Sequence, residues 1–253
     1  MRLDSPYCGF PGLNLSWEVL EGLAKHNGPV IEPGWALAAL DAEVPLDLAR
    51  WPSLEAQVAA LADDIAYDNH DIDDGLRSGF LALDALLELD FVADTWRGVE
   101  RRHPGQPRET QLRELVREQI GAMVNDLLET TRVNLAGVGS IDEVRGAVRP
   151  LVALSPAMAA HERDLKAFLY KHLYYHDEQR TTAERARKVI ARLYAAYHQD
   201  PDLLALAWLE RLPDEEPARS RHIADFIAGM TDRYAIERYR QVFGEVPGVL
   251  SNV

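Results

Sequence analysis

The chain has 253 residues, and 47% of them are hydrophobic, which is enough to bury the core of one or two domains. Its 41 acidic and 27 basic residues give a net charge of −14 at pH 7, which disfavours non-specific binding to nucleic acid and to anionic membranes. The single cysteine, Cys8, excludes an internal disulfide framework, and no signal peptide or membrane-spanning apolar run is evident. We therefore expect a soluble cytoplasmic protein without a membrane or nucleic-acid partner, in which a local basic pocket can still hold a small anion.

Apolar residues recur at helical spacing in nearly every long segment, which predicts an all-α fold built as a multi-helix bundle. Ser16 and Ser53 are the expected N-caps of the first two long segments, and capping boxes at Ser140–Glu143 and Thr181–Glu184 predict two later helix starts. The run His103–Pro107 is expected to break the chain. In chain order, the predicted helices run from 17 to the turn at 27–29, from 54 to 75 or beyond, and over 80–102, 108–135, 164–175, 183–198 and 219–243.

The stretch Ala62–Gly75 is the most informative, because it crowds six acidic side chains, one tyrosine and one histidine onto one helix. Like charges at helical spacing cost a few tenths of a kcal/mol each, so the cluster suggests that a cation or a hydrogen-bonding ligand offsets the repulsion. At about 100° per residue, Asp63, Tyr67 and Asp71 form one drifting stripe along the helix. Carboxylates suit a divalent metal, and a phenol beside a carboxylate suits a sugar hydroxyl. The alternative is a solvated acidic face.

This stretch resembles a motif of the deoxyguanosine triphosphate triphosphohydrolase-like proteins of the HD superfamily. Two further runs agree with the resemblance. Gly12–Pro29 is similar to the segment between that family's His-Asp pair and its last metal aspartate, and Ala224–Ala235 is similar to its C-terminal signature. The resemblance implies an α-helical hydrolase that uses a divalent metal such as Mg²⁺ or Mn²⁺ and an activated water. Its substrate would be a deoxynucleoside triphosphate, with dGTP preferred, its products a deoxynucleoside and inorganic triphosphate, and its assembly a homo-oligomer.

Carried over residue by residue, the resemblance gives Asp63 the role of the final metal-ligating aspartate. Tyr67 and Asp71 match the pair that contacts the deoxyribose 3′-hydroxyl. Lys25 matches a lysine used on the triphosphate, presented at a pocket rim, and His26 is expected to assist it. No catalytic residue is assigned.

Each assignment has a competing interpretation. Asp64 is a rival metal ligand, but it points about 100° away from Asp63. Lys25 can be an ordinary cation favoured at a helix C-terminus, and Tyr67 can be a packed tyrosine. The histidines at 172 and 176 have the i,i+4 spacing of a metal site, although the surrounding tyrosines favour a packed aromatic helix.

Neither His70-Asp71 nor His176-Asp177 has the sequence context of the family's metal-binding doublet. Arg219, Arg221 and Arg233 are expected to pair with surface acids rather than with a phosphate.

The family places a first histidine and a His-Asp doublet upstream of the Gly12 segment, whereas Met1 stands only about a dozen residues before it. We therefore expect an N-terminally incomplete HD-type bundle that binds metal weakly, with 1–102 continuing the HD-type domain and 103–253 forming a helical C-terminal domain. Uncovered apolar faces should favour oligomerisation. A non-catalytic nucleotide-sensing or assembly subunit is the main alternative to an enzyme, and a helical scaffold is the third.

Overall fold

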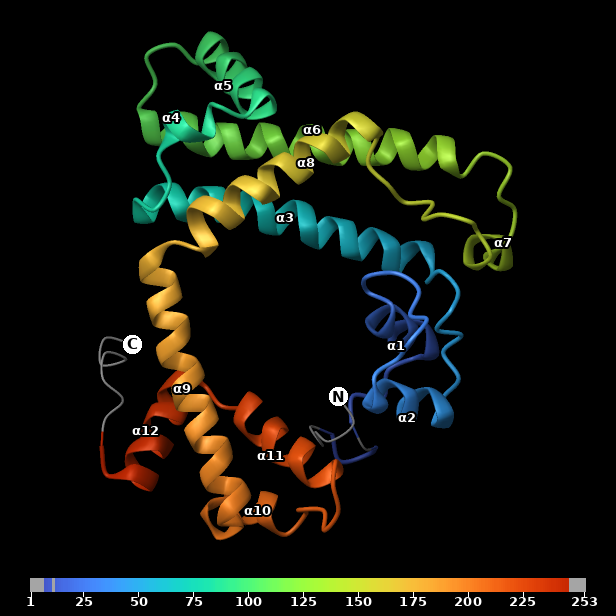
Figure 1. Cartoon of the computed structure of the whole chain (residues 1–253). Helices are drawn as coiled ribbons and strands as arrows, with labels where there is room; N and C mark the ends of the chain where they lie inside the picture. The colour runs from blue at the N-terminus through green and yellow to red at the C-terminus, as the bar shows by residue number, and fades with distance from the viewer. Residues whose placement is uncertain (1–6, 11, 246–253) are drawn as a thin grey trace. The chain divides into compact units, whose positions relative to one another are not determined.

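The structure, a computed structural model, describes residues 7–10 and 12–245. Within those residues the chain forms helices and no strand, which confirms the predicted all-α class (Figure 1). The chain divides into two compact units, one covering residues 1–173 and the other residues 174–253.

The first unit holds eight α-helices within its described part. They are α1 (Trp17–Ala24), α2 (Trp35–Glu43), α3 (Leu54–Ser78), α4 (Leu83–Leu86), α5 (Asp90–Arg102), α6 (Arg108–Asn134), α7 (Ile141–Arg145) and α8 (Pro156–Leu169). A short π-helix, η1 (Tyr170–Tyr174), follows α8.

Helix α3 is the element on which the candidate site depends, and its two ends follow the sequence rules. Ser53 caps it as predicted, because the Ser53 hydroxyl accepts a hydrogen bond from the Ala56 amide. Gly79 ends it in the left-handed region at φ 77°, which a residue without a Cβ adopts at little cost. The helix therefore runs unbroken through the whole acidic stretch.

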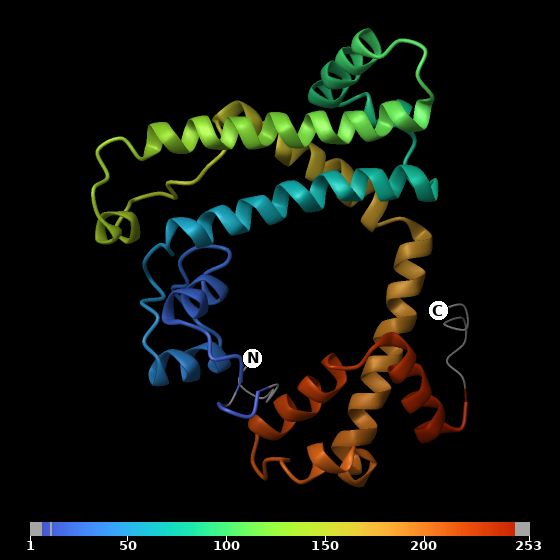
Figure 2. The ribbon, with the colours of Figure 1, turned by 180° about the vertical axis from the view of Figure 1, so that it is seen from behind.

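Helix α3 lies beside the long helix α6, and α8 crosses this pair on one side (Figures 1 and 2). The buried residues at this junction are Ile65 from α3, Met123 and Leu127 from α6, and Val152 from the segment before α8. Burial of such side chains contributes roughly 1.5–3 kcal/mol each. This packing leaves the opposite side of α3 uncovered by α6.

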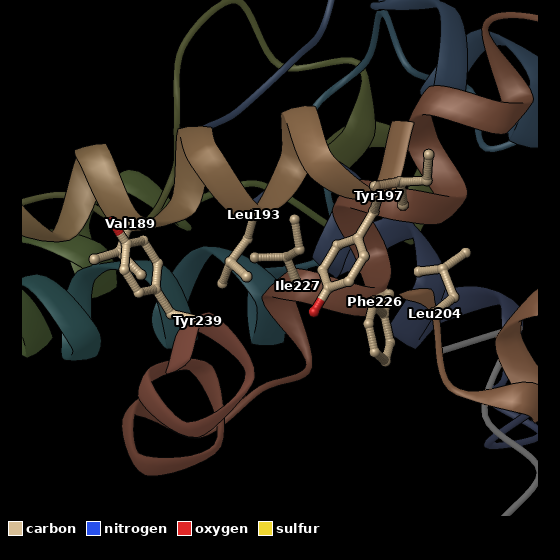
Figure 3. Packing of buried hydrophobic residues seen from close by; sticks show 8 residues of the cluster. Val189, Leu193, Tyr197, Leu204, Phe226, Ile227 and Tyr239 are labelled. Carbon is tan, nitrogen blue, oxygen red and sulfur yellow. The ribbon is translucent and has the colours of Figure 1, made fainter. Parts of the chain in front are cut away.

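The second unit is a small helical bundle around α9 (Asp177–Gln199). Its other helices are η2 (Pro201–Leu203), α10 (Leu206–Leu209), α11 (Ala218–Ala228) and α12 (Asp232–Phe243). Helix α9 presents Val189, Leu193 and Tyr197 at successive turns toward α11 and α12 (Figure 3). The remaining buried members of this core are Leu204, Ile223, Phe226, Ile227 and Tyr239.

Four local predictions need correction. The capping box at Thr181 is wrong, because α9 already begins at Asp177 and the Thr181 hydroxyl donates to the Asp177 carbonyl. The predicted helix over 219–243 is two helices, since Thr231 caps α12 after a break at Gly229.

The predicted segment 80–102 likewise divides into α4 and α5. His172 and His176 do not share one regular α-helix, because His172 lies in the π-helix and His176 is the N-cap of α9. The i,i+4 geometry that would favour a metal at these two histidines is therefore absent.

The sequence also predicts a domain boundary between residues 102 and 103. That family-based boundary stays a prediction. Helix α6 follows this boundary in the sequence, yet it packs against α3 and α5, which precede the boundary. Residues on both sides of the boundary therefore belong to one compact unit.

Candidate functional site

The predicted stripe on α3 is solvent-accessible over three successive turns. The Asp63 side chain is 73% exposed, Tyr67 is 59% exposed, and Asp71 is partly buried. A core tyrosine would be covered, so the exposure of Tyr67 argues against the packed-residue interpretation. The stripe therefore exposes the Asp63 and Tyr67 side chains to solvent, with Asp71 partly buried two turns after Asp63.

His26 lies next to this stripe, although 37 positions of sequence separate it from Asp63. Its Nε2 is 3.7 Å from Asp63 Oδ2, and its side chain is 48% exposed. His26 follows the end of α1, which packs against the first half of α3. The fold therefore brings together two of the predicted site residues, one from the turn after α1 and one from α3.

An open groove of about 1080 Å³ adjoins His26, between α1, the first turns of α3, and α7. Its walls are largely apolar and include Val19, Leu23, Ala59 and Ile141. Ala59 precedes Asp63 by one helical turn, so the groove continues the line of the stripe toward the start of α3.

A second cavity, of about 460 Å³, also has His26 in its wall. Trp51, Asp64 and Glu162 line it as well. Its size is within the range of small-molecule sites.

Lys25 contributes to the lining of this second cavity but is not exposed to solvent. Its side chain is fully buried, and its ammonium donates to Glu21 Oε1 at 2.8 Å, to the Asp47 carbonyl at 2.9 Å and to the Arg50 carbonyl at 3.2 Å. An ammonium has three N–H donors, so none is left for a phosphate in this arrangement. The substrate role of Lys25 stays a prediction, and it would require Lys25 to exchange one of these partners.

Glu21, which the sequence analysis overlooked, is the anion that balances Lys25. Its buried carboxylate also accepts two hydrogen bonds from the Arg145 guanidinium, each 3.0 Å long. Burial by itself would raise the pKa of Glu21, but the hydrogen bonds from Arg145 and Lys25 outweigh it and hold the pKa below its usual range. The i,i+4 spacing of Glu21 and Lys25 is the one sequence signal that predicts this pair.

Asp64, the rival metal ligand, is already engaged. Its Oδ1 is 3.0 Å from the Lys166 ammonium of α8, which also binds Glu162. Burial works against the charged form of Lys166, yet its hydrogen bonds to Glu162 and Asp64 raise the pKa of that amine. The geometry therefore favours Asp63 over Asp64 as the carboxylate open to a ligand.

Asp68 is a buried carboxyl group that the sequence analysis did not single out. Only 1% of the residue is exposed, and its Oδ2 has no hydrogen-bond partner among the described residues. Burial raises the pKa of Asp68 to about 7, although the Lys166 ammonium opposes the shift. Its carboxylate neighbours on α8 and α3 raise the pKa further; they are Glu162, Asp64 and Asp71.

The donor set at the stripe suits a divalent cation only in part. Asp63 and His26 provide a carboxylate and an imidazole, which are common ligands of catalytic metals. Within the described residues, no three histidine, cysteine, aspartate or glutamate side chains gather closely enough to hold a metal.

Residues predicted to be structural behave as expected where the contacts show it. Arg221 pairs with Asp225 at 2.7 Å, and the His172 ring stacks on Phe168. No helix in the described part of the chain has both the length and the apolarity that crossing a membrane requires.

Comparison with known proteins gives two results. Residues 152–241 match the phosphohydrolase-associated domain family, a region that begins before α8 and ends in α12. The chain is 43% identical over 252 residues to the deoxyguanosinetriphosphate triphosphohydrolase-like protein of Parvibaculum lavamentivorans, which covers 96% of this chain and 64% of that protein.

Two further relatives have the same degree of similarity. The deoxyguanosinetriphosphate triphosphohydrolase-like protein 1 of Mesorhizobium japonicum is 43% identical over 260 residues, covering 97% of this chain and 64% of its own length. The corresponding protein of Caulobacter sp. strain K31 is 43% identical over 250 residues, or 96% of this chain and 64% of its own. The chain thus spans about 64% of the length of these relatives.

Proposed function

Because this chain is a homologue of the deoxyguanosinetriphosphate triphosphohydrolase-like proteins and carries a phosphohydrolase-associated domain, we propose that it takes part in hydrolysis of deoxynucleoside triphosphates. The preferred substrate is dGTP, and the products are a deoxynucleoside and inorganic triphosphate. The observation that carries the proposal is the exposed stripe of Asp63, Tyr67 and Asp71, with His26 placed at its first member.

Each of these residues has a role that its chemistry supports. The Tyr67 hydroxyl can donate to, and the Asp71 carboxylate can accept from, the 3′-hydroxyl of a deoxyribose that lies along α3. Asp63 is the carboxylate for a divalent ion, and His26 faces the phosphate end of the substrate. Two bonds to one sugar hydroxyl, together with a fixed helix, orient the substrate before any bond breaks.

A divalent metal bound at Asp63, when present, would supply Lewis acidity toward the phosphate oxygens and lower the pKa of a bound water. Asp63 is suited to hold it because its carboxylate is exposed, whereas Asp64 is committed to Lys166. Metal sites of this kind usually have three or more protein ligands. We therefore propose that turnover by this chain alone is slow.

The proposal can be tested by a thermal-shift titration of the full chain with each of the four deoxynucleoside triphosphates, with and without Mn²⁺. A ligand that binds only the folded state stabilises it by about 2.7 kcal/mol at a hundred times its dissociation constant. We expect the largest shift with dGTP. Release of inorganic triphosphate, followed in parallel, measures turnover.

Matched variants make this test specific. Asp71→Ala should abolish the shift and Tyr67→Phe should reduce it. Asp73→Ala is the control, because Asp73 lies about 200° around the helix from Asp71 and pairs with Arg77. Equal shifts in all three variants, or no shift with any nucleotide, would contradict the proposal.

A non-catalytic nucleotide-sensing or assembly subunit is the second candidate. The engagement of every Lys25 donor by protein atoms favours it, since the expected triphosphate contact is occupied. This candidate predicts nucleotide binding that persists without Mn²⁺, together with no release of triphosphate when Mn²⁺ is added.

We further propose that the protein works in the cytoplasm as a homo-oligomer. The apolar groove supports self-association, because Val19 is 47% exposed and Leu23 is 50% exposed on its α1 wall. Sedimentation velocity at several concentrations measures the assembly, and a monomer at every concentration would contradict it.

A further inference from the structure

The turn that carries His26 is fastened to the segment over residues 46–52 at three points. The Lys25 ammonium donates to the carbonyls of Asp47 and Arg50, as described above. The Val30 amide donates to the Leu48 carbonyl at 2.7 Å. Side-chain and backbone hydrogen bonds together therefore join two stretches of chain that carry no regular structure of their own.

Gly28 provides the third point of attachment. Its φ is 99°, and a Cβ at this position would lie 3.0 Å from the Trp51 ring. The ring can approach the backbone of the turn this closely only because Gly28 carries no side chain. His26 thus lies in a turn whose two ends are both held by the 46–52 segment.

The same segment is anchored on its far side by α7. The Trp51 amide donates to the Arg145 carbonyl at 3.1 Å, and the Arg50 guanidinium donates to the Asp142 carbonyl at 2.9 Å. Arg145 in turn holds the Glu21 carboxylate that faces Lys25. One buried ionic cluster, formed by Glu21, Lys25 and Arg145, therefore connects α1, the 46–52 segment and α7.

We infer that Lys25 is a positioning residue, whose buried ammonium fastens the α1 turn to the 46–52 segment and thereby holds His26 beside Asp63. Lys25 acts through its neighbour rather than by touching a phosphate. The inference rests on the proposed function only for the role that this function gives to His26 and Asp63. The burial and the three hydrogen bonds of Lys25 stand without it.

Loss of the ammonium should release the turn. In Lys25→Met, a side chain of similar length remains, but the Asp47 and Arg50 carbonyls lose their buried donor. Glu21 keeps only its bonds from Arg145. We expect the turn to loosen and His26 to move away from Asp63.

The first test uses the unmodified protein and no nucleotide. The sequence has four lysines, so the acetylation rate of each can be followed by peptide mass spectrometry; they are Lys25, Lys166, Lys171 and Lys188. We expect Lys25 to react at least about tenfold more slowly than the exposed Lys188, because a buried amine reacts only through local opening. Equal rates for the two lysines would overturn the inference.

The same measurement with inorganic triphosphate separates the two roles of Lys25. A positioning residue is acetylated at the same slow rate with and without the anion. A phosphate contact is exposed to reagent in the free protein and is protected by the anion, and that result would overturn the inference. Because acetylation of the free protein involves no nucleotide, failure here is distinguishable from failure of the proposed function.

The second test reads the position of His26 directly. In the wild-type protein, Asp63→Asn should shift the His26 Cε1–H NMR signal, because the carboxylate is 3.7 Å from the imidazole. In a Lys25→Met background the same substitution should leave that signal unchanged, while a Lys188→Met background keeps the wild-type response. A full response in folded Lys25→Met protein would overturn the inference, and if that variant does not fold, the acetylation result decides.

Discussion

The two compact units are stabilised internally by different chemistry. Beside the candidate site, the first unit buries charged groups, notably Glu21 and Lys25 at 0% exposure and Asp68 at 1%. The second unit is centred on apolar and aromatic side chains such as Leu193 and Phe226. Hydrogen bonds between charged side chains fix the distance and the direction between the two groups. Apolar contacts are not directional and require mainly that the side chains fill the available volume. The unit with the candidate site therefore has its geometry specified by polar packing, at the cost of desolvating charges.

The guanidinium groups that contact the core of the second unit lie at its edge. Arg238 donates a hydrogen bond to the Tyr197 hydroxyl at 3.2 Å. Arg192 donates to the Tyr239 hydroxyl and forms an ion pair with Glu245. These guanidinium groups cover the aromatic residues while staying in contact with water. Substitutions should therefore have different consequences in the two units.

The largest expected effect is that of Glu21→Gln in the first unit. Removal of the charge leaves Lys25 and Arg145 without their shared anion, and breaking such a buried pair costs about 3 to 5 kcal/mol of unfolding free energy. Urea unfolding at pH 7 measures the loss. Glu18→Gln on the same helix is the control, because Glu18 is exposed and its loss should change the stability much less.

The difference in stability between wild type and Glu21→Gln should depend on pH. The folded-state pKa of Glu21 lies below its usual value of 4.5, so its contribution is fully present above about pH 4.5 and is lost as the pH falls through the folded-state value. Wild type and Glu21→Gln should therefore converge in stability under acid. A difference that stays constant down to the acid transition would contradict the ionic interpretation.

Leu193→Ala tests the second unit and should cost about 3 kcal/mol, because it opens a cavity in an apolar core. We expect no change in the His26 signal, since an apolar contact in the other unit specifies no geometry at the site. Ile190→Ala serves as the matched control on α9, where the side chain is 52% exposed. A shift of the His26 signal in Leu193→Ala would break the distinction between the units.

Asp68→Asn should stabilise the first unit at pH 8, by about 2 kcal/mol, and should do so much less at pH 5. The reason is that burial raises the pKa of Asp68 from 3.8 to about 7. Between these two pH values the folded protein keeps the proton on Asp68, whereas the unfolded chain releases it. The folded state of the wild type therefore loses stability as the pH rises from 3.8 to about 7, and Asn at this position removes that loss. Melting curves at the two pH values measure the effect. Asp73→Asn, at a partly exposed position on the same helix, is the control for the substitution itself.

Ser53→Ala should give the smallest effect, a loss of about 1 kcal/mol, because only the hydroxyl that caps α3 is removed. Ser78→Ala at the other end of the same helix should cost less, since that hydroxyl donates to carbonyls of its own last turn. Thermal unfolding followed by circular dichroism compares the two. Equal losses would show that α3 depends on tertiary packing more than on its cap.

Local signals in the sequence were sufficient for α3, α6 and the stripe, but they missed α2 and placed the start of α8 too late. Ser53 as a cap, the length of α6 and the shared heading of Asp63, Tyr67 and Asp71 all follow from interactions within a few residues. Local signals failed where only a short break separates two consecutive helices. The divisions within 80–102 and 219–243 depend on how the flanking helices pack, so periodicity merged them.

The all-α class and the residues that share one face of α3 can be predicted from the sequence, because they depend on helical spacing, and three sequence motifs carry the resemblance to a hydrolase family. The surroundings of those residues depend on the tertiary structure. It places His26 beside Asp63, pairs Lys166 with Asp64, and surrounds the Lys25 ammonium with Glu21 and two backbone carbonyls. The physical reason is that burial and ion pairing between distant segments follow from packing, and no local spacing rule encodes which charge a folded chain encloses.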